Sequence, residues 1–183
     1  MKKLLMGLAL GLACMGVSAQ EAVAEGAAAE KANWPVWLSF NTSDDMDIVG
    51  FRFTFPYGSC ESVTGLDIGF YGVTRYMEGF QINLLRNEAV DRLAGFQVGI
   101  YNTAGSAEMF GAQIGLFNEC GSISGLQAGV INVANAVYGF QVGLVNRAET
   151  LYGFQVGLVN VIRDSELPFF PVLNIGLDEY SKY

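Results

Sequence analysis

The chain has 183 residues, of which 10 are Lys or Arg and 18 are Asp or Glu, and it contains no histidine. A net charge of −8 argues against a nucleic-acid partner, because phosphate backbones bind basic faces. The absence of histidine removes the commonest general base and the commonest transition-metal ligand. We therefore expect a protein that is not an enzyme, with no catalytic, cofactor-binding or metal-binding residue.

The N-terminus has the composition of a secretory signal peptide. Lys2 and Lys3 precede an apolar run that ends at Val17, and small residues follow as far as Ala19. We expect cleavage after Ala19; a lipoprotein signal that modifies Cys14 is the alternative. The cleaved chain keeps 8 basic and 18 acidic residues, a net charge of −10. Residues 20–33 are rich in Ala and Glu and are interpreted as a flexible linker, and residues 34–183 as one β-repeat domain.

The octapeptide GFQVGLVN occurs twice between Gly139 and Asn160, with a spacing of 14 residues. Related units recur along the chain, and their central residues fall at seven positions: 67, 81, 97, 113, 127, 141 and 155. Seven copies indicate that the repeat is itself the fold.

Each unit predicts a β-strand. In the last copy, Phe154 and Val156 are bulky and apolar, whereas Gly153, Gln155 and Gly157 are small or polar. This alternation has a period of two, which is typical of a pleated strand with different faces. Frequent glycines would also disfavour a helix by about 1 kcal/mol each relative to alanine.

Two all-β architectures fit such a series. One clear turn per unit, at the recurrent Asn, and the even spacings between most units favour an antiparallel up-and-down meander. Gln141 would then face Gln155, and Val145 would face Leu151 around a loop at residues 146–150. We predict about ten strands closing into a barrel, with an irregular loop near Tyr57. A β-solenoid of 14–16-residue coils remains the alternative.

The apolar face suggests that such a barrel lies in the outer membrane, where lipid would be its partner. The protein would be a monomer with a structural or surface-interaction role. The alternative is a secreted, periplasmic or surface-attached repeat module that binds a protein or glycan through its Gly-Gln face. The interior of the barrel would be filled by the polar residues at the centres of the units: Arg52, Asp67, Gln81, Gln97, Gln113, Gln127, Gln141 and Gln155.

Three further features bear on possible sites. Arg52 and Asp67 occupy the same level of adjacent strands, so we interpret them as an ion pair that fixes the pairing of the early strands. The acidic segment 41–47 lacks the ligand spacing of a calcium loop and is interpreted as a solvated loop. Cys60 and Cys120 both follow the predicted cleavage site, and the sequence leaves open whether they form a disulfide.

The motif G-[FL]-Q-x-G-[LV]-x-N with its 14-residue spacing, followed by the segment from Leu167 to Gly176, resembles a family of bacterial exported surface-repeat proteins. The resemblance covers about residues 48–177. Asn83 and Asp67 depart from the motif, in place of a glycine and a glutamine. The resemblance implies export and a repeat architecture, and it implies no activity.

Overall fold

The computed structural model describes residues 38–40, 44–165 and 168–176. Every element in these ranges is a β-strand, which confirms the all-β prediction. No helix in the described ranges is long and apolar enough to cross a membrane. The predicted signal peptide, Cys14 and the predicted linker lie outside the described residues.

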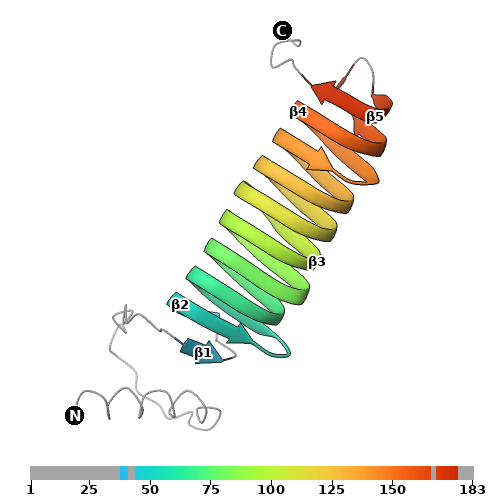
Figure 1. Cartoon of the computed structure of the whole chain (residues 1–183). Helices are drawn as coiled ribbons and strands as arrows, with labels where there is room; N and C mark the ends of the chain where they lie inside the picture. The colour runs from blue at the N-terminus through green and yellow to red at the C-terminus, as the bar shows by residue number, and fades with distance from the viewer. Residues whose placement is uncertain (1–37, 41–43, 166–167, 177–183) are drawn as a thin grey trace, which may run out of the picture. The chain divides into compact units, whose positions relative to one another are not determined.

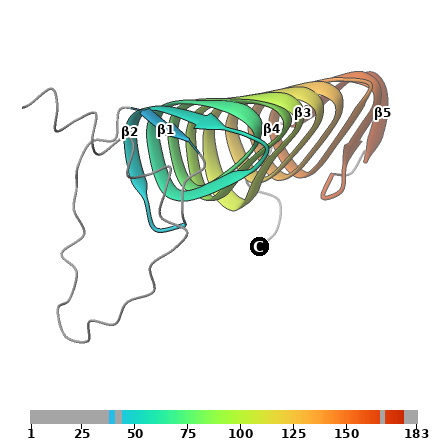
Figure 2. The same ribbon diagram turned by 90° about the horizontal axis from the view of Figure 1, so that it is seen from below.

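The strands wind into a solenoid of stacked coils (Figure 1). β1 (Leu38–Phe40) and β2 (Asp47–Thr54) lie at one end, and β5 (Phe169–Gly176) lies at the other. Between them, β3 (Gly58–Val142) and β4 (Val145–Ile162) pass through one coil after another. The turned view in Figure 2 shows the same coils stacked along one axis. The sheet order is therefore the sequence order, β1-β2-β3-β4-β5.

The predicted antiparallel barrel is wrong, because successive coils pair in parallel. Val145 pairs with Ile131 and Leu151 pairs with Val137, one coil earlier, instead of facing each other across a hairpin. Gln141 does lie beside Gln155, as the spacing predicts, but both strands run in the same direction. The architecture is the β-solenoid that the sequence left as the alternative.

Each coil consists of extended segments joined by bends, although the sequence shows only one obvious turn (Figure 1). One bend lies beside a glycine two residues before the central position. Gly139 and Gly153 have φ values of 138° and 136°, a region that residues with a side chain rarely adopt. The other bend follows the glutamine, where Gly143 and Leu144 separate β3 from β4. Residues 146–150, predicted as a hairpin loop, belong to β4.

The interior is built from four stacks of side chains that run along the axis. One is apolar and contains Leu151 and its equivalents, and a second is small and contains Ala148 and its equivalents. The other two are polar: a glutamine ladder and an asparagine ladder, both fully or almost fully buried. Half of the interior stacks are therefore polar, and their amides need partners inside the protein.

The two ends of the solenoid differ. β1 is a short parallel edge strand, whereas β5 reverses direction and pairs antiparallel with β4. β5 contains Pro171, which fits an edge position because proline donates no hydrogen bond. Residues 55–57 interrupt the strands between β2 and β3, where the sequence predicts an irregular loop.

Candidate functional site: a buried polar ladder and an exposed apolar face

The glutamine ladder is a continuous chain of side-chain hydrogen bonds. From Gln97 onward, each glutamine donates from Nε2 to Oε1 of the glutamine one coil earlier, as Gln155 does to Gln141 at 2.7 Å and Gln141 to Gln127 at 2.7 Å. Most also donate to a backbone carbonyl of their own coil, for example Gln155 to Val161 at 3.2 Å. The described members are fully buried: Gln81, Gln97, Gln113, Gln127, Gln141 and Gln155.

The asparagine ladder runs beside it with the opposite polarity. Asn146 Nδ2 donates to Oδ1 of Asn160 in the following coil at 2.8 Å, and also to the Val156 carbonyl at 2.9 Å. The asparagines predicted from the sequence as turn residues are therefore interior residues that connect consecutive coils: Asn102, Asn118, Asn132, Asn146 and Asn160. Asn87 belongs to the same ladder and donates to Asn102. Each net hydrogen bond of this kind contributes about 1 kcal/mol, and an unpaired buried amide costs about 1–3 kcal/mol.

Arg52 and Asp67 close the N-terminal end of the glutamine ladder. They lie in register on β2 and β3, both fully buried, with a bidentate contact of 2.8 Å from Nε and 2.6 Å from Nη2. Asp67 also accepts from Thr54, Gln81 and Asn83. Burial alone would lower the pKa of Arg52, but the hydrogen bonds and the charge of Asp67 raise it above its ordinary value.

The C-terminal end of the ladder carries no charge. Gln155 Oε1 is buried and has no hydrogen-bond partner among the described residues, and neither has Asn174 Nδ2. These two residues pair in register between β4 and β5. An acceptor and a donor therefore lie at the same level, where the reversed β5 replaces the next parallel coil.

The eight residues predicted to fill a barrel lumen lie instead in the interior of the solenoid, where all of them are fully buried. Their amide groups are used within the ladder and are inaccessible from outside. The predicted Gly-Gln binding face is consequently not a surface. A partner or glycan would instead meet the side chains next to each glutamine.

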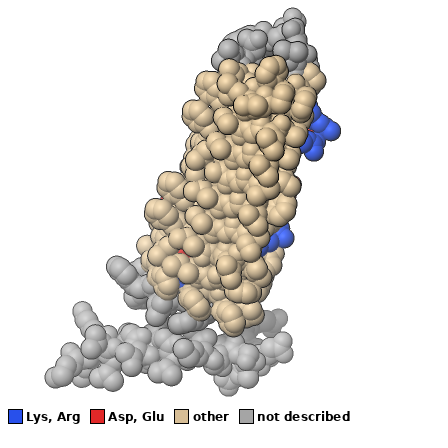
Figure 3. Space-filling model, turned by 45° about the vertical axis from the view of Figure 1, so that its right-hand side comes forward, with Lys and Arg blue, Asp and Glu red and all other residues tan. Residues whose placement is uncertain are grey.

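Those neighbouring side chains form a broad apolar face. Rows of Phe, Ile, Val and Leu point outward, with exposed fractions from 36% to 65%. Figure 3 shows a view of the solenoid in which the centre is almost without charged side chains. We define the apolar face by fifteen residues: Phe80, Ile82, Leu84, Phe96, Val98, Ile100, Ile114, Leu116, Val130, Phe140, Val142, Leu144, Phe154, Val156 and Leu158.

The aromatic members of this face stack between coils. The rings of Phe80 and Phe96 are 5.1 Å apart and nearly parallel, and those of Phe140 and Phe154 are 5.6 Å apart. Leu173 and Ile175 of β5 lie beside Val156 and Phe154 and are themselves exposed. The antiparallel last strand therefore extends the apolar face by one further strand.

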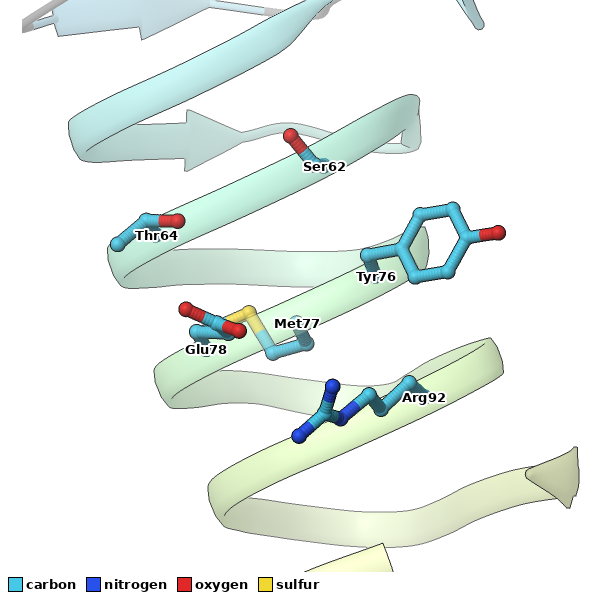
Figure 4. Close-up of a pocket in the computed structure, with 6 residues that line it drawn as sticks. All are labelled: Ser62, Thr64, Tyr76, Met77, Glu78 and Arg92. Carbon is cyan, nitrogen blue, oxygen red and sulfur yellow. The ribbon is translucent and has the colours of Figure 1, made fainter. Parts of the chain in front are cut away.

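The charged residues lie outside the apolar face. Arg75 contacts Asp91 at 3.0 Å and Glu61 at 3.5 Å, and Arg163 contacts Glu149 at 3.5 Å. A pocket of about 310 Å³ also lies there, with Glu78 and Arg92 on successive coils and the buried Met77 beneath them (Figure 4). The remaining lining residues are Ser62, Thr64 and Tyr76. Figure 4 also shows the chain bending just after Thr64 and Glu78, next to Gly65 and Gly79.

The acidic segment 41–47 is described only from Asp44 onward. Asp47 accepts a hydrogen bond of 2.5 Å from Ser62, its register partner in the next coil. No group of three His, Cys, Asp or Glu residues among the described positions has the arrangement to hold a metal ion.

The two cysteines both lie in the small interior stack, where both are buried. Cys60, Thr74, Ala89, Ala104 and Cys120 follow one another along it, so four coils separate the two cysteines. At about 4.8 Å per coil this is nearly 20 Å, far beyond the roughly 7 Å limit between Cα atoms for a disulfide. The structure thus decides the pairing that the sequence left open.

Burial raises the pKa of Cys120 to about 12, so its thiol stays protonated near neutral pH. We expect Cys120 to resist alkylation in the native protein at pH 8 and to react once the protein is unfolded, as measured by mass spectrometry.

The thiol of Cys120 also predicts how stability depends on pH. In the unfolded state it ionises from about pH 8.5, so between that pH and 12 the unfolded state binds fewer protons than the folded state. The stability of the wild-type protein should therefore fall more steeply with pH in this window than the stability of Cys120→Ala. This variant places at position 120 the residue type that the same stack has at Ala134. Equal slopes would contradict the assignment.

Comparisons of the chain with protein-family models, with curated proteins and with solved structures find no match.

Proposed function

We propose that this chain is an exported, non-catalytic β-solenoid module that works by binding a partner through its apolar face. The observation that carries the proposal is the size and continuity of this face. Fifteen side chains that are each 36–65% exposed present on the order of 1,000 Å². The largest apolar patch on a typical monomer is about 300–600 Å².

The construction of the solenoid supports this role. The ladders place the amides inside, so the chain keeps its coils together without a large apolar core. The bulky apolar side chains of the repeat are then left outside, where their burial would contribute about 25 cal/mol per Å². An apolar surface of this kind favours association over catalysis, because it offers contact area and no reactive group.

A photo-crosslinking amino acid at Val142 tests the proposal in the cells that produce the protein. We expect covalent adducts from Val142, which lies on the apolar face and is 43% exposed. The matched control is Asn135, which is exposed and belongs to the row of Glu149, away from the apolar face. Adducts are expected to be several times weaker there. Equal yields at the two positions, or no adduct from Val142, would overturn the proposed function.

A further inference from the structure

We propose that the partner of the apolar face is a second copy of this chain, so that two solenoids pack face to face as the two sheets of a sandwich. The inference rests on the proposed function, since it names the partner of the same face. The dimer would be two-fold symmetric, with the apolar face of each copy against that of the other.

The area of the face is sufficient for a stable dimer. A standard protein interface buries roughly 800 Å² per partner, and the apolar face exposes on the order of 1,000 Å². Leu173 and Ile175 of β5 add to it without adding charge. The composition, aromatic and aliphatic with no charged residue, resembles a domain core divided in two, as in homodimer interfaces.

The relief of the face is also complementary to itself. A shallow apolar groove of about 560 Å³ crosses the last coils, with Gly129, Gly143 and Gly157 among its lining residues. On either side stand the rows that contain Val142 and Leu144. A row of bulky side chains from another copy has the same repeat of about 4.8 Å per coil, so its residues can enter the groove in step.

Charge argues against an anionic membrane as the partner of the apolar face. After the predicted cleavage the chain carries a net charge of −10, which would be repelled by the negative surface potential of anionic lipids. In a face-to-face dimer the described ion pairs, such as Arg75 with Asp91, remain away from the contact. The sequence analysis expects a monomer, and the proposed dimer departs from that expectation.

Sedimentation velocity of the exported and processed chain, from about 1 to 100 µM, tests the inference. We expect a mass twice that of the monomer, and monomers for Ile114→Lys, because symmetry buries the new charge twice. The expected increase in Kd is at least about 100-fold. Asn135→Lys makes the same charge change away from the apolar face and should leave the dimer intact.

The double substitution Val142→Thr and Val156→Thr provides a second test of the dimer in case Ile114→Lys fails to fold. Threonine shares the β-branched shape and strand preference of valine, and both positions are exposed in the monomer, so the fold is retained while the face becomes more polar. It should weaken the dimer at least about tenfold, with an unchanged circular dichroism spectrum.

A wild-type chain that stays monomeric at 100 µM would overturn the inference, as would a dimer that persists in both face variants. A monomer that floats with neutral phosphatidylcholine vesicles would assign the face to lipid instead. If the wild type is monomeric but Val142 still forms adducts with a different protein, the proposed function stands and only the identity of the partner is wrong.

Discussion

Asp67→Ala is expected to destabilise the solenoid by about 3–5 kcal/mol, because it leaves the Arg52 guanidinium buried without its counter-charge. The substitution also removes one of the two acceptors of Gln81, which keeps only its hydrogen bond to the Gly72 carbonyl. Urea unfolding followed by circular dichroism measures the change. Because Arg52 and Asp67 join β2 to β3, hydrogen exchange should rise first in β2.

A matched double variant separates charge from packing. Arg52→Gln with Asp67→Gln continues the ladder with the side chain that follows at Gln81 and each later coil. We expect it to recover most of the lost stability, since a neutral hydrogen-bonded pair avoids the desolvation of two ions. Asp67→Asn keeps the shape and should fall between the two. Unchanged stability in both single variants would disprove the role of the ion pair in fixing the early coils.

Gly139→Ala is expected to cost about 3 kcal/mol or more and to disrupt the neighbouring coils. Gly139 has a φ of 138°, and a Cβ there would overlap the carbonyl oxygen of Gly125 in the previous coil. Both the bend and the parallel pairing would have to adjust, because the obstacle is backbone and not a movable side chain. Thermal unfolding should show a lower midpoint or a less cooperative transition.

Gly105→Ala is the control for this prediction. Gly105 is exposed, and the nearest atom to a Cβ there is the Val90 carbonyl oxygen at 3.2 Å. We expect a change within about 0.5 kcal/mol, as for ordinary surface substitutions. Equal effects at the two positions would show that loss of glycine in general, and not the bend at Gly139, determines the result.

The repeat in the sequence determines much of this fold. Alternation at Phe154, Gln155 and Val156 predicts strands with the glutamines on one face, because successive side chains of any strand point to opposite sides. The repeat places Gln141 beside Gln155 and Arg52 beside Asp67, since equivalent positions of successive units align when the coils stack. The residues of the polar ladder are thus predictable, although the enclosure around them is not.

The direction of the strands is decided only by the tertiary structure. A period of two is the same in parallel and antiparallel pairs, so the alternation cannot distinguish a hairpin from a coil. In the sequence, Gly153 lies within a run that reads as one continuous strand. The bend there is not visible from the sequence, because the sequence specifies the glycine and not its φ of 136°. Without that bend each unit shows a single turn, which favours the meander.

The positions of the asparagines and cysteines show the same limit. Asparagine is a residue type that favours turns, yet the side chain of Asn146 lies in the interior. The alternation of inward and outward side chains changes phase between Gln141 and Asn146. In the sequence Cys60 and Cys120 are a possible disulfide pair. Their distance along the solenoid axis excludes this disulfide, and that distance is known only from the tertiary structure. The sequence by itself determined the strands, the repeat and the sets of residues that stack. Only the tertiary structure decided the parallel winding, because a local period of two does not specify which strands pair over long range. The parallel winding encloses the amides and leaves the apolar face exposed.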